Sequence, residues 1–274
     1  MRTLIAVPVY NEQKYVTKVL DEIRRYANGD ILVIDDGSTD QTPLLLAQQP
    51  VDVVRHAQNR GYGQSLIDAF RWTLCNRYDW LITMDCDEQH EPASLPDFHR
   101  AIEQLDADVI SGSRYLDASL VAVGGPPADR RSINATLTQT LNRSLGLSIT
   151  DAFCGYKAYR VRAVRHLMLD ETGYAFPIQF WVQCVANGLR IKEIPVRLIY
   201  KDPNRSFGAV LDNPEHRLRH YEGVLAREMD KFPGKFPGKF PVTTEVTQPV
   251  SVGSDASSAE PCNCNTSPQR ADCV

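Results

Sequence analysis

Short apolar runs rich in β-branched residues alternate, over the first half of the chain, with segments in which apolar residues have helical spacing. The runs lie at residues 4–9, 31–34, 51–54, 80–84 and 109–111. In the segment 16–27, apolar side chains recur every three or four positions, which places them on one face of a helix. Strands that alternate with helices predict βαβ units, so we predict an α/β fold with a mostly parallel central sheet flanked by helices.

Three further elements are predicted in the second half of the chain. They are a helix at 176–186 ended by Asn187-Gly188, a strand at 190–200 broken by Pro195, and a last helix from Asn213 to about Met229. We interpret Arg217, Arg219 and Arg227 on the last helix as a solvated face, with contact to anionic lipid as the alternative. Residues 1–230 should form a single domain, and residues 231–274, which have little apolar content, a disordered low-complexity tail.

Composition narrows the range of functions. The chain has 274 residues, and 30 Lys and Arg against 34 Asp and Glu give a net charge of −4. A chain without an overall basic field is not expected to bind nucleic acid. No apolar run is long enough for a signal peptide or a membrane-spanning helix, so we expect a cytoplasmic protein with no transmembrane span. The seven cysteines, an odd number, argue against a disulfide framework.

Two carboxylates, Asp85 and Asp87, directly follow the apolar run 80–84. Residues two apart in extended backbone project to the same side, so both side chains can bind one hard divalent cation. Asp106 and Asp108 have the same spacing, but they precede a predicted strand and lie at the edge opposite to the one where parallel sheets bind ligands. We therefore interpret this second pair as a solvated turn.

Polar residues follow every predicted strand of the first half. They are Asn11 and Glu12, Asp35 and Asp36, residues 59–61, residues 85–87, and Arg114 with Tyr115. Because the carboxyl ends of parallel strands meet at one edge, these residues should form one site for a charged nucleotide ligand. The chain has no G-x-G-x-x-G after its first strand, and it has neither G-x-x-x-x-G-K-[ST] nor G-x-S-x-G. Dehydrogenase, P-loop and serine hydrolase chemistry are therefore disfavoured.

The same segments resemble the serial motifs of glycosyltransferase family 2, and within it polyprenol-phosphate or dolichol-phosphate mannosyltransferases. The first four are Val-Pro-Val-Tyr-Asn-Glu at 7–12, Asp-Asp-Gly-Ser-Thr-Asp at 35–40, Asn-Arg-Gly-Tyr-Gly at 59–63 and Asp-Cys-Asp-Glu-Gln-His-Glu-Pro at 85–92. The later ones are Gly-Ser-Arg-Tyr at 112–115, Asp-Ala-Phe-Cys-Gly-Tyr-Lys at 151–157, Gly-Tyr-Ala-Phe at 173–176 and Glu-Ile-Pro-Val at 193–196. The resemblance covers about residues 3–208 and implies a Rossmann-like GT-A fold, with residues 1–230 as the catalytic domain.

The resemblance also implies roles for individual residues. The nucleotide would be bound by Pro8, Tyr10, Asn11, Glu12, Asp35, Asp36 and Gly61. A Mg²⁺ or Mn²⁺ ion would be bound by Asp85, Asp87 and Gln89, and phosphate by Arg114 with Arg130 or Arg131. The expected catalytic residues are thus Asp85, Asp87, Arg114 and Arg131.

For the reaction, the resemblance implies transfer of a hexose from a nucleoside-diphosphate sugar to a polyprenyl phosphate, such as dolichyl or undecaprenyl phosphate. The expected hexose is mannose, donated by GDP-mannose. Such an acceptor is already anionic, so it needs no general base, and a single displacement with inversion is expected. Gln179 fits this expectation, because it stands where many relatives carry glutamate and cannot act as a base.

Two alternatives stay open: a family 2 enzyme that uses a UDP-sugar and a glycan acceptor, and a non-catalytic protein that binds sugar nucleotides. The chain departs from lipid-directed relatives, because residues 205–208 lack a Ser-Lys pair and no carboxy-terminal membrane spans are predicted. The loop 120–127 beside Arg130 and Arg131 is interpreted as a contact with the cytoplasmic membrane face or as a lid over the sugar site.

Overall fold

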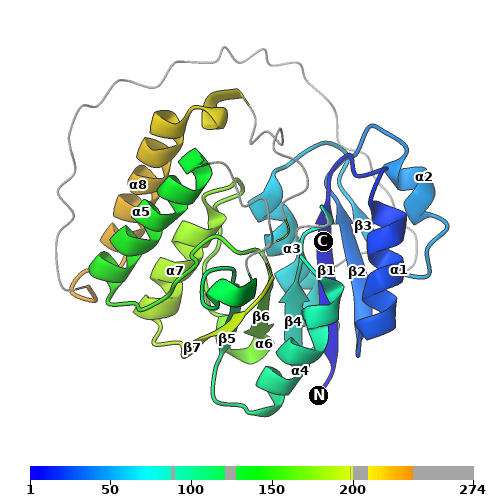
Figure 1. Cartoon of the computed structure of the whole chain (residues 1–274), viewed down its shortest axis with the longest axis horizontal. Helices are drawn as coiled ribbons and strands as arrows, with labels where there is room; N and C mark the ends of the chain where they lie inside the picture. The colour runs from blue at the N-terminus through cyan, green and yellow to red at the C-terminus, as the bar shows by residue number, and fades with distance from the viewer. Residues whose placement is uncertain (88–89, 121–127, 198, 200–208, 237–274) are drawn as a thin grey trace, which may run out of the picture.

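The computed structural model describes residues 1–87, 90–120, 128–197, 199 and 209–236. A seven-stranded sheet runs through its centre in the order β3-β2-β1-β4-β6-β5-β7 (Figure 1). The strands are β1 Thr3–Val9, β2 Asp30–Asp35, β3 Asp52–Arg55, β4 Trp80–Thr83, β5 Val109–Ser113, β6 Lys157–Arg160 and β7 Ile191–Pro195. All neighbouring strands are parallel except β6, which is antiparallel to both β4 and β5. The predicted α/β fold with a mostly parallel sheet is confirmed.

Two details of the sheet differ from the prediction. Strand β6 was not expected, because its four residues begin with Lys157 and end with Arg160 and show no alternation, yet all four are buried between β4 and β5. The predicted strand at 190–200 is shorter and ends at Pro195. Proline has no backbone N–H to donate to a sheet, so it is a natural place for pairing to stop.

Helices cover both faces of the sheet. The helices are α1 Val16–Tyr26, α2 Thr42–Leu46, α3 Tyr62–Cys75, α4 Leu95–Glu103, α5 Ala128–Leu145, α6 Val161–Val164, α7 Phe176–Ala186 and α8 Pro214–Asp230, with short 3₁₀ turns η1 Pro92–Ser94, η2 Ala118–Leu120 and η3 Ala209–Asp212. Alternate residues of β1 face opposite layers: Leu4 and Ala6 pack with α3, α5, α7 and α8, whereas Ile5 and Val7 pack with α1, α2 and α4.

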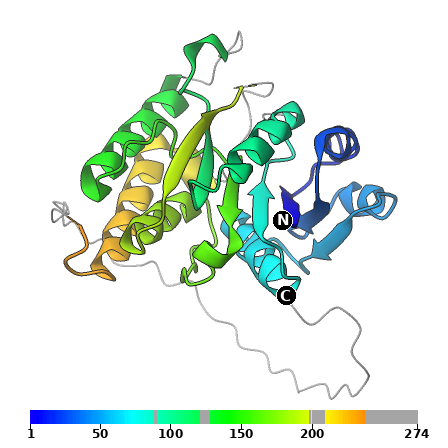
Figure 2. The ribbon, with the colours of Figure 1, turned by 90° about the horizontal axis from the view of Figure 1, so that it is seen from below.

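The helices α5, α7 and α8 lie side by side over the β6-β5-β7 end of the sheet (Figures 1 and 2). The side chain of Asn213 caps α8 by accepting hydrogen bonds from the backbone amides of Glu215 and His216. Arg219 and Arg227 are exposed as predicted, but Arg217 is only 4% exposed, so its assignment to a solvated face was wrong. Arg217 is one turn from the buried Tyr221 and shares its inward face.

The carboxy-terminal packing continues past residue 230. Phe232 and Phe236 are partly buried against the core cluster that contains α8. The remaining residues of the predicted tail, 237–274, lie outside the described residues. In the described part of the chain, no helix combines the length and the apolar character that a membrane crossing requires.

Candidate active site

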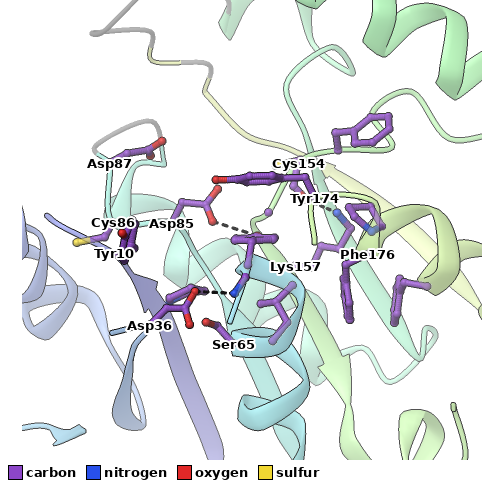
Figure 3. Close-up of a pocket in the computed structure, with 18 of the residues that line it drawn as sticks. Tyr10, Asp36, Ser65, Asp85, Cys86, Asp87, Cys154, Lys157, Tyr174 and Phe176 are labelled. Carbon is purple, nitrogen blue, oxygen red and sulfur yellow. Dashed lines mark hydrogen bonds between the residues drawn. The ribbon is translucent and has the colours of Figure 1, made fainter. Parts of the chain in front are cut away.

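A cavity of about 450 Å³ opens at the carboxyl ends of the central strands. Figure 3 shows part of its lining, with Tyr10, Asp36, Asp85 and Asp87 gathered on one side and Phe176 on the other. The structure thus brings together around one cavity most of the residues predicted from the sequence: Pro8, Tyr10, Glu12, Asp36, Gly61, Asp85, Asp87 and Arg114. Asn11, Asp35 and Arg131 do not line it, and Gln89 lies outside the described residues.

Asn11 connects two loops instead of facing the cavity. Its backbone adopts a φ of 56°, which Asn tolerates better than most residues. The side-chain Oδ1 of Asn11 accepts hydrogen bonds from the backbone amides of Thr39 (2.8 Å) and Asp40 (3.3 Å). The backbone amide of Asn11 donates to Oγ of Ser38 (2.9 Å). Asn11 therefore joins the segments 10–12 and 38–40, and its contact with a nucleotide stays a prediction.

Asp35 lies beneath the cavity and is fully buried. Its Oδ1 accepts a hydrogen bond from the amide of Ser38 at 2.9 Å, and its Oδ2 lies 3.1 Å from Nε of Arg55 without hydrogen-bond geometry. Asp35 therefore fixes the turn that follows β2, and it is not among the residues that line the cavity.

Asp36 reaches the cavity but belongs to a buried network around His56. Nδ1 of His56 lies 2.6 Å from Oδ1 of Asp36, and its Nε2 lies 3.0 Å from Oδ2 of Asp68. The carboxylate of Asp36 also accepts hydrogen bonds from the backbone amides of Arg60 (2.7 Å) and Gly61 (2.9 Å). Buried carboxylates need such partners, and here they hold the glycine-containing loop against the cavity.

Position 61 requires a glycine, because of its backbone conformation and because of the close packing around it. Its φ is 102°, and a Cβ at this position would lie 2.4 Å from the carbonyl oxygen of Thr172. The amide of Gln64 donates to the same carbonyl at 3.1 Å. The loop after β3 therefore packs directly on backbone from the segment before α7, a contact that no side chain would allow.

Asp85 and Asp87 line the cavity after β4, as predicted. Oη of Tyr62 donates to Oδ1 of Asp85 at 3.1 Å, and burial, followed by the charge of Asp85, raises the pKa of Tyr62 well above its usual value. The amide of Asp85 donates to Nδ1 of His90 at 3.0 Å. Gly155 lies so close that a Cβ there would be 2.6 Å from Oδ2 of Asp85.

The donor chemistry of this pair suits a hard divalent cation, because it consists of carboxylate oxygens beside a glycine that leaves room for them. Within the described ranges, no group of three His, Cys, Asp or Glu side chains is arranged to hold a metal ion. Asp85 and Asp87 can thus supply two ligands, and the remaining ligands would have to come from substrate, water or residues beyond the described part.

Arg114 lines the cavity, but it forms a two-point ion pair with Asp151. Its Nε and Nη2 donate to the two carboxylate oxygens of Asp151 at 2.6 and 2.9 Å, and Asn134 donates to the same carboxylate at 3.1 Å. Burial by itself would raise the pKa of Asp151, but the charge and hydrogen bonds of Arg114 hold it well below the usual value. Arg114 therefore anchors the loop that begins at Asp151, and a role in binding phosphate stays a prediction.

Two other residues that the sequence brought into the argument, Arg131 and Gln179, do not line the cavity, and the phosphate-binding role of Arg131 stays a prediction. Arg131 is exposed on the first turns of α5 and does not face the cavity. Gln179 is buried outside the lining of the cavity. Its Oε1 accepts hydrogen bonds from the backbone amides of Asp170 and Glu171, both at 2.8 Å, and its Nε2 donates to Glu228 at 2.9 Å. Gln179 ties α7 to α8, so it carries no information about a catalytic base.

Several residues that line the cavity were given no individual role in the site from the sequence. They are Tyr62, Asn134, Phe153, Lys157, Tyr174 and Arg217. Lys157 stands in the segment 151–157, so its motif was visible; its Nζ donates to the carbonyl of Cys154, and burial lowers its pKa. Asn134 and Arg217 had no such signal, because their helices become part of the cavity wall only through packing.

The pair Asp106 and Asp108 lies away from the cavity, as predicted, but it is not simply solvated. Asp106 forms an ion pair with Lys192 at 2.8 Å, and Asp108 forms ion pairs with Arg190 at 3.0 Å and Arg160 at 3.3 Å. These contacts join the start of β5 to its neighbours in the sheet. The same Asp-x-Asp spacing therefore has a structural role at one edge of the sheet and lines a cavity at the other.

Comparison with known proteins agrees with this geometry. The family model for glycosyl transferase family 2 matches residues 4–168. Undecaprenyl-phosphate mannosyltransferase of Micrococcus luteus is 32% identical over 215 residues, which cover 75% of this chain and 87% of the relative. Polyprenol monophosphomannose synthase of Mycolicibacterium smegmatis is 30% identical over 207 residues, which cover 71% of this chain and 76% of the relative.

Among solved structures, glucosyl-3-phosphoglycerate synthase from Mycobacterium tuberculosis, crystallised with Mn²⁺, UDP and glucosyl-3-phosphoglycerate, has a similar fold. Its TM-score is 0.65 at 18% identity, and the match covers 83% of this chain and 79% of that one. At this identity the likeness concerns the fold alone. Since the family model matches more than half of the chain and the fold agrees, the chain belongs to glycosyltransferase family 2 and is a glycosyltransferase with the GT-A fold.

Proposed function

We propose that the protein transfers mannose from GDP-mannose to a polyprenyl phosphate, with inversion at the anomeric carbon and with Mg²⁺ or Mn²⁺ as cofactor. The observation that carries this proposal is the division of one cavity into an acidic half and a half lined by aromatic and cationic side chains. The two mannosyltransferase relatives, one acting on undecaprenyl phosphate and one making polyprenol monophosphomannose, support the choice of sugar and acceptor.

The acidic half suits the donor. Tyr10, which is 46% exposed, and the buried Glu12 both line the cavity, and they would contact the base and ribose of the donor. Asp85 and Asp87 would hold the cation, which, when bound, supplies Lewis-acid stabilisation of the leaving nucleoside diphosphate. The loop at Arg60 and Gly61, fixed by Asp36 and His56, would form the floor beneath the donor.

The acceptor phosphate would act as the nucleophile without a base. One of its oxygens forms the bond to the anomeric carbon while the bond from that carbon to the diphosphate oxygen breaks, so the attacking group needs no proton removed. The residues around it then have to position the two reactants and balance their negative charges. Lys157 and Arg217 supply positive charge in the cavity for this purpose.

A donor and acceptor panel tests the proposal. Purified protein would be incubated with GDP-mannose, UDP-glucose or UDP-N-acetylglucosamine, each with Mn²⁺ or Mg²⁺, and with a short polyprenyl phosphate or an oligosaccharide. We expect product from GDP-mannose and polyprenyl phosphate, with β configuration at the anomeric carbon by NMR because the donor is α-linked. Transfer to the oligosaccharide from a UDP-sugar would favour the alternative enzyme, and tight donor binding without product would favour a non-catalytic protein.

Access to a lipid acceptor also implies contact with a membrane surface. Residues 121–127 of the loop 120–127, which the sequence suggests for this contact, lie outside the described residues, whereas the exposed Arg131 follows the loop on α5. Liposomes that contain anionic lipid, prepared with or without polyprenyl phosphate, are expected to bind the protein and carry it upward in a flotation assay. Absence of flotation with both kinds of liposome would count against a membrane-bound acceptor.

A further inference from the structure

His56 stands between two carboxylates that come from different parts of the fold. It follows β3, while Asp36 follows β2 and Asp68 lies on α3. All three side chains are buried. Nδ1 of the ring lies 2.6 Å from Oδ1 of Asp36, and Nε2 lies 3.0 Å from Oδ2 of Asp68. Each ring nitrogen therefore faces a carboxylate oxygen at hydrogen-bond distance.

The hydrogens in these two contacts have to come from the ring. A neutral imidazole carries one hydrogen, so it would present a lone pair to one of the two carboxylates. Such a contact would be repulsive at 2.6 or 3.0 Å if the carboxylate is ionised. The ring avoids this repulsion only when both nitrogens carry hydrogen.

Both carboxyl groups have the hydrogen-bond partners of ionised groups. Each of their four oxygens accepts a hydrogen bond from a donor other than His56, and an ionised carboxylate is an acceptor at both oxygens. The donors to Asp36 are backbone amides, and those to Asp68 are side chains. They are the amides of Arg60 (2.7 Å) and Gly61 (2.9 Å), Nη1 of Arg71 (3.0 Å) and Nε2 of Gln64 (2.9 Å).

A positive ring would also offset the charge of the two carboxylates. Buried carboxylates are costly unless a cation lies beside them. Arg60 and Arg71 approach Asp68 at 3.6 and 3.0 Å, but their side chains are 47% and 55% exposed, so water weakens this attraction. His56, in contrast, is buried together with Asp36 and Asp68 and lies between them.

Asp36 connects the ring with the cavity. Its carboxylate lines the cavity and accepts the hydrogen bonds from the amides of Arg60 and Gly61. Gly61, whose φ is 102°, also lines the cavity. The ring thus joins α3 to a loop in the acidic half of the cavity, although His56 itself does not line it.

We propose that His56 is an imidazolium in the folded protein and a positioning residue for the nucleotide donor. One ring nitrogen holds Asp36, and through it the loop at Arg60 and Gly61, while the other nitrogen is anchored to Asp68 on α3. This inference rests on the proposed function, because it takes the acidic half of the cavity as the donor site. It extends that function to a residue that lies between the motifs at 35–40 and 59–63.

The protonation of the ring is measured by ¹⁵N NMR of the full chain labelled at histidine, at neutral pH, with the ring signals assigned through the backbone of His56. We expect both ring nitrogens to show a one-bond coupling to hydrogen, as in an imidazolium. In a neutral ring one nitrogen lacks hydrogen and resonates far from the other. Finding such a nitrogen in His56 would overturn the inference, whatever the variants below do.

His56→Gln tests the positioning role, because glutamine is neutral and carries its donors on one nitrogen. Affinity for GDP in the presence of Mn²⁺, measured by calorimetry, should fall about 10- to 100-fold, since a charge-assisted hydrogen bond to Asp36 or Asp68 is lost. In turnover the loss should appear in KM for the donor, with kcat within about threefold of wild type. His216→Gln, exposed on α8, is the matched control and should leave these values unchanged.

A second substitution separates the charge of His56 from its packing. In His56→Gln two buried carboxylates remain without the charge of the ring, and Asp68→Asn removes one of them. The double variant should therefore bind GDP about tenfold more tightly than His56→Gln, whereas Asp68→Asn alone should weaken binding relative to wild type. If His56 only filled space, the two losses would add, and additive losses would contradict the inference.

Amide hydrogen exchange distinguishes failure of this inference from failure of the proposed function. The amides of Arg60 and Gly61 should exchange about tenfold faster in His56→Gln than in wild type, whether or not a nucleotide binds. If wild-type protein binds neither GDP nor UDP, the proposed function fails, and faster exchange leaves the positioning of the loop by His56 standing. Unchanged exchange, or unchanged GDP affinity in folded His56→Gln, overturns the inference.

Discussion

The two ends of the cavity are built in different ways. The acidic end is formed by loops that follow strands β1, β2, β3 and β4, and its side chains are fixed by hydrogen bonds to backbone amides, as in Asp36 and Asn11. The opposite end is formed by faces of α5, α7 and α8, and its side chains are fixed mainly by packing, as in Phe153 against Tyr221. The first construction depends on short segments of sequence, and the second on how distant segments meet.

Each end also contains a buried ionic network with its own task. His56 lies between Asp36 and Asp68 and orders the loop under the predicted donor site. Arg114 pairs with Asp151, and the amide of the neighbouring Thr150 donates to Glu193 of β7. This network therefore joins the end of β5 and strand β7 to the loop before β6. The first network thus fixes a loop that lines the cavity, and the second fixes the segment before β6.

Breaking the Arg114–Asp151 pair is expected to have the largest effect on stability. Arg114→Met leaves a fully buried carboxylate without its cation, which should lower the free energy of unfolding by about 3–5 kcal/mol at neutral pH. Because the folded-state pKa of Asp151 lies below its unfolded value, the wild-type contribution is present above pH 4 and is lost as pH falls further. Urea unfolding should therefore show a difference between wild type and variant that narrows toward acid pH. Arg190→Gln, at an exposed ion pair, should leave the unfolding midpoint nearly unchanged.

Removing a carboxylate at the acidic end should affect activity more than stability. Asp87→Ala is expected to lower kcat/KM by about 10²- to 10³-fold, since it removes charge that would hold the cation at the leaving group. Calorimetry should show that Mn²⁺ no longer strengthens binding of the nucleotide. Asp106→Ala, which removes the first carboxylate of the other Asp-x-Asp pair, is the matched control and should retain turnover. Equal losses in both variants would contradict the assignment of the site.

The contact between the two ends can be disturbed at Gly155. A Cβ there would lie 2.6 Å from Oδ2 of Asp85 and 2.8 Å from Oη of Tyr62, so Gly155→Ala must displace at least one of them. We expect kcat/KM to fall about 10- to 100-fold, because small displacements at a reacting centre are costly. Gly223→Ala in α8 meets no atom closer than Nη1 of Arg227 at 3.9 Å, and it should leave kinetics unchanged while adding about 0.5–1 kcal/mol of stability. Normal kinetics in Gly155→Ala would show that Asp85 need not be held where it is.

Arg131 should give the smallest effect. Since its side chain is exposed and does not line the cavity, Arg131→Gln is expected to leave GDP binding unchanged. Partition onto anionic liposomes should fall about fivefold, in line with roughly 1 kcal/mol for each basic residue near such a surface. A loss of nucleotide affinity in this variant would restore Arg131 to the phosphate-binding role that the sequence suggested.

The sequence alone determined the architecture around the acidic end of the cavity. The apolar runs located β1 to β5 and the polar residues after them, because strand ends in a parallel sheet share an edge whatever the rest of the chain does. Asp85, Asp87, Glu12 and Gly61 were found in this way, and all four line the cavity. Within the same segments, however, pattern could not tell a residue that faces the cavity from one that supports it, so Asn11 and Asp35 were assigned to the ligand.

Only the tertiary structure decided which residues form the opposite end of the cavity. Strand β6 is too short to alternate, and α5 has polar residues such as Asn134 and Thr138 on its buried side, so neither produced a clear pattern. Arg217 is inward-facing because the preceding turn η3 and the helix α5 pack against α8, and the contact of α8 with α5 joins segments far apart in the chain. Local spacing encodes which faces of an element are apolar, but the direction in which a polar side chain points depends on the neighbours that close over it.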